Sequence, residues 1–158
     1  MDYLRIPLHN NKGFVLVDAE DAPLVERFSW CLSGDGRYAQ AHCGELGRRF
    51  LHQLLMPTCA EPDHINGDGF DNRRSNLRPS SRAQNAKNRK RHSNNTSGFK
   101  GVSWDSRDQR WYARIYSDGK KISLGSYSDP SDAARAYDEA SLIHHGGFAR
   151  TNASMATG

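Results

Sequence analysis

The feature that most constrains the fold of this sequence is a block of positive charge in the middle of the chain. Residues 72–104 carry nine lysines and arginines and no acidic residue. Within the block, residues 91–97 (RHSNNTS) are polar, without apolar periodicity, and cannot contribute to a hydrophobic core. We therefore expect two small domains, at residues 1–90 and 98–152, joined by a basic linker at residues 91–97.

Composition narrows the class of protein further. The chain has 158 residues, of which 36% are hydrophobic, and its mean hydropathy is -0.82, so any core is modest. No run approaches the roughly 18 apolar residues of a membrane helix, and the N-terminal MDYLRIPLHN lacks the pattern of a secretion signal. Three cysteines at irregular spacings argue against a disulfide scaffold or a zinc knuckle. These features predict a protein of a reducing cytoplasm.

The distribution of charge favours a polyanionic partner. Residues 1–71 carry 6 basic and 11 acidic side chains, and residues 105–158 carry 7 of each, so the net charge of +4 arises from the central block. A basic segment of this kind attracts nucleic acid and releases its counterions. A passive solvated linker is the alternative interpretation of the same charge.

Short strands dominate the pattern of the N-terminal half. FVLVD, residues 14–18, is β-rich and apolar, and Asp18 can cap a helix over about residues 19–28. RYAQAHC, residues 37–43, alternates polar and apolar side chains as a strand does. RFLHQLLM, residues 49–56, is an apolar strand or helix. This half is therefore expected to mix short strands with at least one short helix.

The C-terminal half predicts three strands followed by one helix. The strand candidates are GFKGVSW (98–104), RWYARIY (110–116) and KKISLGSY (120–127). Asp129 is expected to cap a helix over SDAARAYDEASLIHH, residues 131–145. The expected fold class is α+β, with this small antiparallel sheet packed on one helix.

Alternation assigns the faces of these elements. In the middle strand, Trp111, Ala113 and Ile115 share one face, and Tyr112, Arg114 and Tyr116 share the other. In the third strand, Ile122 and Leu124 face opposite to Lys121 and Ser123. The helix is expected to place one stripe on the sheet: Ala133, Ala136, Tyr137, Ala140 and Ile143. The outward face would carry cationic and aromatic groups together, as a reader of nucleic-acid grooves does.

The stretch EPDHINGDGFDNRRSNLR, residues 61–78, combines groups that hydrolysis of a phosphodiester requires. His64 is suited to activate a water molecule, because an imidazole titrates near neutral pH. Asp63 offers a carboxylate oxygen to a hard divalent cation. Adjacent residues of a strand point to opposite sides, so both reach one phosphate only if the Asn66–Gly67 turn bends the backbone.

Two amides complete the candidate site. Asn76 can pin His64 or its loop through hydrogen bonds. Asn85 is our choice for a second oxygen ligand, because it lies in a helix that Ser81 can cap.

Each of these residues also has a purely structural interpretation. An aspartate–histidine pair in a turn-rich loop is usually ordinary surface chemistry. Asp71 or Asn72 can cap a helical turn, and Asn76 can act as a cap as well. His52 lies in an apolar run and can simply be a packed histidine, and zinc held by His52, Cys59 and His64 is a further alternative.

At this point a resemblance can be stated. FLHQLLM followed by PDHINGDGFDNRRSNLRPSSRAQNAKN resembles the HNH homing endonucleases of phages and mobile introns, densely over residues 50–88. The upstream elements IPL, FVLVD, Trp30 and Tyr38–Ala39 are similar to the N-terminal portion of such proteins, whereas Phe70 stands where that family more often has leucine.

The HNH resemblance implies a β-β-α-metal nuclease module encoded by a phage and active in a bacterial cytoplasm. It implies that His64 is the general base and that Asn76 fixes the loop that carries it. It implies that Asp63 and Asn85 bind one Mg²⁺ or Mn²⁺ per active site. His52 matches an upstream histidine of the family and is included among the catalytic candidates.

Residues 97–152 resemble a second family, the plant Apetala-two/ethylene-response-factor DNA-binding domain. SGFKGVSW, RWYARI, LGSY, AARAYDEA and GGFARTN match its successive motifs. In that family the three-stranded sheet enters the major groove. The resemblance implies that the groove-reading residues are Lys100, Ser103, Arg114, Tyr116, Lys121 and Ser123. Several of these positions are arginine or tryptophan in the plant proteins, so the plant target sequence is in doubt.

Three functions follow for testing. The first is a metal-dependent, site-directed DNA endonuclease, acting as a monomer or weak dimer on double-stranded DNA. The second is a non-catalytic DNA-binding regulator, and the third is an RNA-binding protein. Besides the sheet residues, the cations expected to grip the backbone are Arg73, Arg74, Arg78, Arg82, Lys87, Arg89, Lys90 and Arg91.

Overall fold

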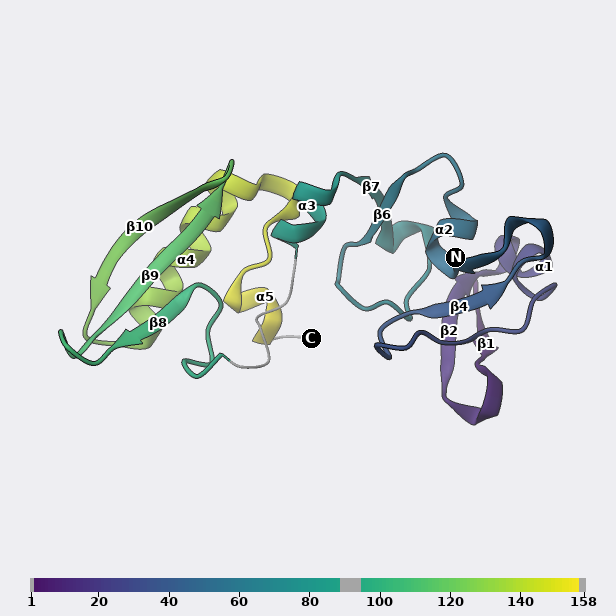
Figure 1. Ribbon diagram of the computed structural model, residues 1–158, viewed down its shortest axis with the longest axis horizontal. Helices are drawn as coiled ribbons and strands as arrows, with labels where there is room; N and C mark the ends of the chain where they lie inside the picture. Colours follow the sequence, from purple (N-terminus) through teal and green to yellow (C-terminus); the bar gives the residue numbers. More distant parts are fainter. Residues whose placement is uncertain (1, 89–94, 157–158) are drawn as a thin grey trace. The chain divides into compact units, whose positions relative to one another are not determined.

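The computed structural model describes residues 2–88 and 95–156, and the chain divides into two compact units, residues 1–85 and 86–158 (Figure 1). Both units combine antiparallel sheets with helices, which confirms the expected α+β class. The expected linker at residues 91–97 falls largely on residues 91–94, which lie outside the described part of the chain. Among the described residues no helix has the length and apolar character that a bilayer crossing requires.

The first unit is built from short elements. Its strands are β1 (Tyr3–Pro7), β2 (Phe14–Asp18), β3 (Cys31–Leu32), β4 (Ala39–His42), β5 (Arg48–Phe50), β6 (Glu61–His64) and β7 (Leu77–Ser80). Its α-helices are α1 (Ala22–Val25), α2 (Leu51–Leu55) and α3 (Arg82–Lys87), the last of which crosses the division at residue 85. Single 3₁₀ turns are η1 (His9–Asn11), η2 (Ala19–Asp21), η3 (Gly44–Leu46) and η4 (Arg74–Asn76).

Three small sheets organise these strands. β1 pairs with β2, β4 lies between β3 and β5, and β6 pairs with β7. The loop after β6 is fastened to β2, because Leu16 N–H donates to Phe70 O and Asn72 N–H donates to Leu16 O, both at 2.8 Å. The His64 loop therefore forms part of the fold and is not a free surface excursion.

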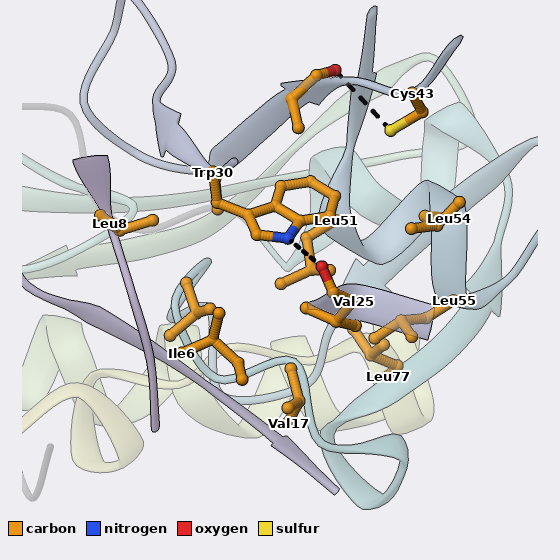
Figure 2. Close-up of a cluster of buried hydrophobic side chains, with 13 residues drawn as sticks. Ile6, Leu8, Val17, Val25, Trp30, Cys43, Leu51, Leu54, Leu55 and Leu77 are labelled. Carbon is orange, nitrogen blue, oxygen red and sulfur yellow. Dashed lines mark hydrogen bonds between the residues drawn. The ribbon is translucent and has the colours of Figure 1, made fainter. Parts of the chain in front are cut away.

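A buried cluster joins the β1–β2 hairpin, β4 and α2 (Figure 2). Its largest fully buried side chain is Trp30, which packs among Val17, Val25 and Leu51. The Trp30 indole N–H donates to Val25 O at 2.9 Å, so this aromatic ring is buried without an unsatisfied donor. The cluster extends to Leu77 on β7 and so connects the core to the β6–β7 pair.

The structure corrects the expected helix over residues 19–28. Residues 19–21 form the 3₁₀ turn η2, and α1 ends at Val25, whose carbonyl accepts the Trp30 indole N–H. Asp18 stands at the N-cap position without a side-chain capping bond. Its carboxylate accepts the Arg74 N–H at 2.7 Å instead, so a tertiary contact replaces the local cap.

The other expected elements of this unit form with clear bounds. The alternating stretch contains β4, and the apolar stretch that was either strand or helix is both, with β5 leading directly into α2. Ser81 caps α3 as expected, because Gln84 N–H donates to Ser81 Oγ while Ser81 N–H donates to Gln84 Oε1. The expected caps at Asp71 or Asn72 do not form; Arg73 precedes η4 without a side-chain cap.

The second unit is one sheet and one long helix (Figure 1). Its elements are β8 (Val102–Asp105), β9 (Arg110–Ser117), β10 (Lys120–Tyr127), α4 (Pro130–His145), η5 (Gly146–Phe148) and α5 (Asn152–Ala156). β9 lies between β8 and β10, and both pairs are antiparallel. Asp129 caps α4, because its carboxylate accepts the Ser131 N–H at 2.7 Å, which confirms the expected start.

The helix packs on the sheet through small side chains. Ala113 and Ile115 of β9 are buried against Ala133, Tyr137 and Ala140 of α4. The expected stripe is wrong at its end, because Ile143 is 79% exposed. The buried face continues instead through Ser141 to His145, so the buried stripe turns around the helix axis toward the end of α4. The Nε2 atom of His145 lies 2.9 Å from Tyr116 O.

A glycine permits a close approach between the turn before β8 and α4. Gly101 has a φ of +77°, and a Cβ there would collide with the ring of Tyr137. The segment before β8 is also clasped from the C-terminal side, because Lys100 N–H donates to Asn152 Oδ1 at 2.6 Å and Asn152 Nδ2 donates to Asp138 Oδ1 at 2.9 Å. The turn before β8, α4 and the C-terminal segment therefore form one structural unit.

Candidate functional site

The β6–β7 pair places the aspartate–histidine pair inside the first unit. Asp63 is opposite Arg78 and His64 is opposite Leu77 in the antiparallel register. Asp63 is 5% exposed and His64 is 4% exposed. The strand pair followed by α3 gives the strand–strand–helix order that the sequence suggested.

Arg78 is bound to the candidate metal ligand. Its Nε and Nη2 donate to the same carboxylate oxygen, Asp63 Oδ2, at 3.0 and 2.8 Å. The Arg78 side chain is only 17% exposed, so this ion pair is largely shielded from water. Charge-assisted hydrogen bonds to a buried carboxylate are strong, and removing one partner destabilises the fold because it leaves the other charge buried without compensation.

Asn72 orients the imidazole of His64. Its Oδ1 lies 3.2 Å from His64 Nε2, while its Nδ2 donates to Gly69 O at 3.2 Å, which fixes the orientation of the amide. Because an amide oxygen can only accept, Nε2 carries the proton of the neutral ring and Nδ1 is the basic nitrogen. Burial lowers the pKa of His64, opposed by the Asn72 bond and the nearby carboxylates. The neutral ring is the form that a general base requires.

Asn76 ties the loop that carries His64 to β7. Its Oδ1 accepts the Asn66 N–H at 3.0 Å, and its Nδ2 donates to Asn66 Oδ1 at 3.0 Å and to Asp71 O at 2.7 Å. Gly67 has a φ of +65° and its N–H donates to His64 O at 2.8 Å, which closes the expected turn. The geometry of Asn76 is that of a residue which positions the loop.

His52 lies on α2 with its ring against that of His64. The two ring centroids are 5.0 Å apart and the ring planes meet at 82°. His52 is buried, which lowers its pKa to about 3, and its Nδ1 has no hydrogen-bond partner. Its place beside His64 suits a packing neighbour of the candidate base.

Tyr38 completes the wall around the two histidines. Its ring centroid lies 5.2 Å from that of His52 and 5.8 Å from that of His64. A side chain at Gly69 would collide with Arg37 O and the Tyr38 ring, so the His64 loop packs directly on this tyrosine. In the sequence Tyr38 was noted only as part of an upstream resemblance, and its contact with the two histidines, which are distant from it in the chain, was not predicted. The contact of Asn72 with His64 was not predicted either.

The zinc alternative is not supported by the arrangement of side chains. Among the described residues, the one group of three or more potential metal-binding side chains with mutually close donor atoms is Asp18, Glu20 and Asp21, and His52, Cys59 and His64 do not form another. The acidic trio already receives Arg74, whose Nε and Nη2 donate to the two oxygens of Asp21 at 2.9 and 2.6 Å.

Asn85 lies on α3, half-buried, with its N–H donating to Ser81 O at 2.9 Å. Its expected role as a metal ligand together with Asp63 stays a prediction.

The central basic block is less available than its sequence suggests. Arg73 pairs with Asp71, Arg74 with Asp21, and Arg78 with Asp63. These three arginines were expected to grip a phosphate backbone, and in the folded unit each is paired with a carboxylate that lies outside the basic block. Arg82 is exposed and Lys87 is half-buried, while Arg89, Lys90 and Arg91 lie outside the described residues.

The C-terminal sheet presents an open face of the expected composition. Cross-strand pairs place Lys121 beside Tyr116, Ser123 beside Arg114, and Ser103 beside Tyr112. Tyr116 is 64% exposed, and Ser103, Lys121 and Ser123 are exposed as well. The guanidinium of Arg114 lies 5.2 Å from the centroid of the Tyr112 ring. Five of the six expected groove-reading residues therefore share this surface, which we call the outward sheet face: Ser103, Arg114, Tyr116, Lys121 and Ser123.

Lys100, the sixth expected groove-reading residue, does not lie on the outward sheet face. Its Nζ donates to Lys87 O at 2.9 Å and to Arg150 O at 3.4 Å. Burial lowers its pKa to about 8, and the charge of Arg150 acts in the same direction. Lys100 is half-buried, its Nζ is bonded to backbone carbonyls, and it is not part of the outward sheet face.

With this geometry in hand, comparison with known proteins assigns the second unit. Residues 97–142 match the family model of the AP2 domain. Over 85 residues the chain is 37% identical to the "Ethylene-responsive transcription factor ERN1" of Medicago truncatula, a match that covers 52% of this chain and 31% of that protein. The chain thus spans about a third of the length of this relative. Its three-stranded sheet and helix are an AP2 domain.

The chain is also similar to proteins of viruses. Over 88 residues it is 33% identical to "Protein 3.8" of Escherichia phage T7, covering 56% of this chain and 72% of the phage protein. The chain belongs to the family of this phage protein. It is also 26% identical over 151 residues to "Uncharacterized HNH endonuclease L560" of Acanthamoeba polyphaga mimivirus, covering 92% of this chain and 78% of that protein. This similarity extends over both units of the chain, which the AP2 match does not.

Proposed function

We propose that this phage-type protein binds double-stranded DNA through the outward sheet face of its AP2 domain and cleaves it with an HNH-type module in its first unit. The observation that carries the nuclease half is the arrangement around His64. The Nε2 of buried His64 lies against the amide oxygen of Asn72, and Asn76 fastens the loop that follows His64. The carboxylate of Asp63 is on the same strand. A 26% identical relative that covers most of the chain carries the name of an HNH endonuclease.

The proposed roles follow from chemistry. His64 Nδ1 takes a proton from the attacking water, because Asn72 holds Nε2 in its protonated form. Asn76 keeps the loop in position, and His52 and Tyr38 limit rotation of the His64 ring. These contacts hold the His64 ring, at the last residue of β6, in one orientation for proton transfer.

The residues present suit one divalent ion. Asp63 and Asn85 would hold it, since carboxylate and amide oxygens are the ligands that Mg²⁺ and Mn²⁺ prefer. The fit is supported by Arg78, whose guanidinium already places a positive charge on Asp63 Oδ2. When bound, the ion supplies positive charge to the phosphate and to the leaving oxygen.

The experiment is cleavage of supercoiled plasmid by the full chain with Mg²⁺ or Mn²⁺, and again with EDTA. Conversion to open-circle or linear DNA that stops with EDTA supports the proposal. Plasmid that stays intact across a randomised target library while duplex binding persists would remove the nuclease half. A nicked product would indicate one active site at work, and a linear product a pair of protomers.

A second function has its own supporting observation. Asp63 and His64 are both almost fully buried, and Asp63 is already paired with a cation, which suits a non-catalytic DNA-binding regulator. The relative that carries the name of a transcription factor points the same way for the AP2 domain. The plasmid assay separates the two functions, and competition between RNA and duplex DNA tests RNA as the partner.

A further inference from the structure

The candidate metal ligand Asp63 already has a cationic partner in the fold. Arg78 Nε and Nη2 both donate to Asp63 Oδ2, and the two residues face each other across the β6–β7 pair. Asp63 is 5% exposed and the Arg78 side chain 17% exposed, so little water screens the contact. The pair belongs to the ordered interior of the unit.

A divalent ion and this guanidinium have conflicting requirements. A hard cation binds a carboxylate oxygen at about 2.0–2.6 Å. With Arg78 bonded to the same carboxylate, two positive centres would lie within a few ångströms of each other in a poorly screened site, where like charges repel strongly. An ion held by Asp63 would therefore compete with Arg78 for this carboxylate.

We propose that Arg78 occupies the cation side of Asp63 in the metal-free protein and thereby sets the affinity of the site for divalent metal. This inference depends on the proposed function, because it assumes that Asp63 is a metal ligand. Arg78 is then a competitor built into the strand opposite the ligand, and the sequence NLR at residues 76–78 places it there. Removing the guanidinium leaves a buried carboxylate that needs another cation.

The chain offers a matched control. Arg73 binds Asp71 through Nε and Nη2, each at 2.7 Å, in an equally close arginine–aspartate pair of the same unit. Asp71 is buried as Asp63 is, but it is not a proposed metal ligand. Substitution of Arg73 therefore removes an arginine–aspartate pair that involves neither of the proposed metal ligands, Asp63 and Asn85.

The test measures Mn²⁺ binding to the full chain by electron paramagnetic resonance, with no DNA present. We expect Arg78→Gln to tighten Mn²⁺ binding by at least about tenfold, while Arg73→Gln changes it by less than about twofold. Asp63→Asn should abolish the site in wild type and in the Arg78→Gln background. Arg78→Lys keeps a charge but loses the planar two-donor contact, so it should tighten binding by a smaller factor.

The outcomes distinguish the two proposals. Wild-type binding that requires Asp63, without any gain in Arg78→Gln, would overturn the role of Arg78 and leave the metal site standing. Absence of Asp63-dependent binding in both proteins would overturn the metal site and this inference with it. If Arg78→Gln does not unfold cooperatively on heating, Arg78→Lys decides: binding no tighter than wild type counts against the inference.

Discussion

The two units of this protein differ in what their arginine side chains contact. In the first unit, arginines of the central basic block are tied to buried or nearby carboxylates, as Arg73, Arg74 and Arg78 show. In the AP2 domain, Arg114 lies over Tyr112 on an exposed sheet beside Tyr116 and Lys121. A formal count of charge treats these cations alike, although the three arginines of the first unit are paired with carboxylates and Arg114 and Lys121 lie on the outward sheet face. The comparison teaches that burial and pairing decide which charges are available.

The largest expected effect concerns the buried histidine of the first unit. We expect His64→Ala to reduce DNA cleavage by at least about 100-fold, because the proposed general base is lost. Duplex affinity, which we propose the other unit carries, should stay within about twofold. Plasmid cleavage and gel shift on the same samples measure both, with His42→Ala, an exposed histidine, as control. Equal loss of cleavage and binding would show that the units are not independent.

The next effect is on the stability of the AP2 domain. Gly101→Ala should destabilise it by more than about 2 kcal/mol, because the new methyl group collides with Tyr137 at a position of positive φ. Gly119→Ala is the matched control, since it shares a positive φ of +76° but has open space around it, and should cost about 1 kcal/mol.

Calorimetry of the full chain is the measurement for both glycine variants. Only the transition of the second unit should move to lower temperature in Gly101→Ala. A shift of both transitions by equal amounts would indicate that the two units unfold as one.

A smaller effect is expected at the outward sheet face. The double variant Arg114→Ala/Lys121→Ala should weaken duplex binding about tenfold and reduce the slope of log affinity against log salt by about two. Arg73→Gln should change affinity by less than about twofold, because that guanidinium is engaged by Asp71. Fluorescence anisotropy across a salt series measures both. A larger loss in Arg73→Gln would reverse the contrast drawn between the units.

The smallest effects are in the pH dependence of stability; in both units stability should rise with pH, but over different pH ranges. Buried His52 has a pKa lowered from 6.5 to about 3, so between these values the unfolded chain binds the His52 proton more readily than the folded chain does. The first unit should therefore lose stability as pH falls below 6.5. Half-buried Lys100 has a pKa lowered from 10.5 to about 8, so the unfolded chain also binds more protons between these values. The AP2 domain should therefore gain stability as pH rises from about 8 to 10.5.

Each slope is at most about 1.4 kcal/mol per pH unit. Denaturation at a series of pH values measures them, and His52→Phe and Lys100→Met should flatten the acid and the alkaline slope respectively. Slopes that persist in these variants would assign the titration to other groups.

Much of the AP2 domain could be predicted from the sequence. Alternation in WYARIY placed Ala113 and Ile115 inward and Arg114 and Tyr116 outward, and Asp129 marked the start of α4. These signals are local, because strand alternation and helix caps depend on neighbours in the chain. The resemblance placed Lys100 among the groove-reading residues, whereas in the structure its Nζ donates to the carbonyls of Lys87 and Arg150.

In the first unit the sequence by itself determined the components: the aspartate–histidine pair, the turn at Gly67, the Ser81 cap and the amides. The tertiary structure alone decided how they are used. Asp18 caps no helix because Arg74, 56 residues away, takes its carboxylate, and Arg78 faces Asp63 because β6 and β7 pair in one register. Pairing between distant residues depends on which strands meet. No local pattern contains that information, since it is set by packing of the whole core.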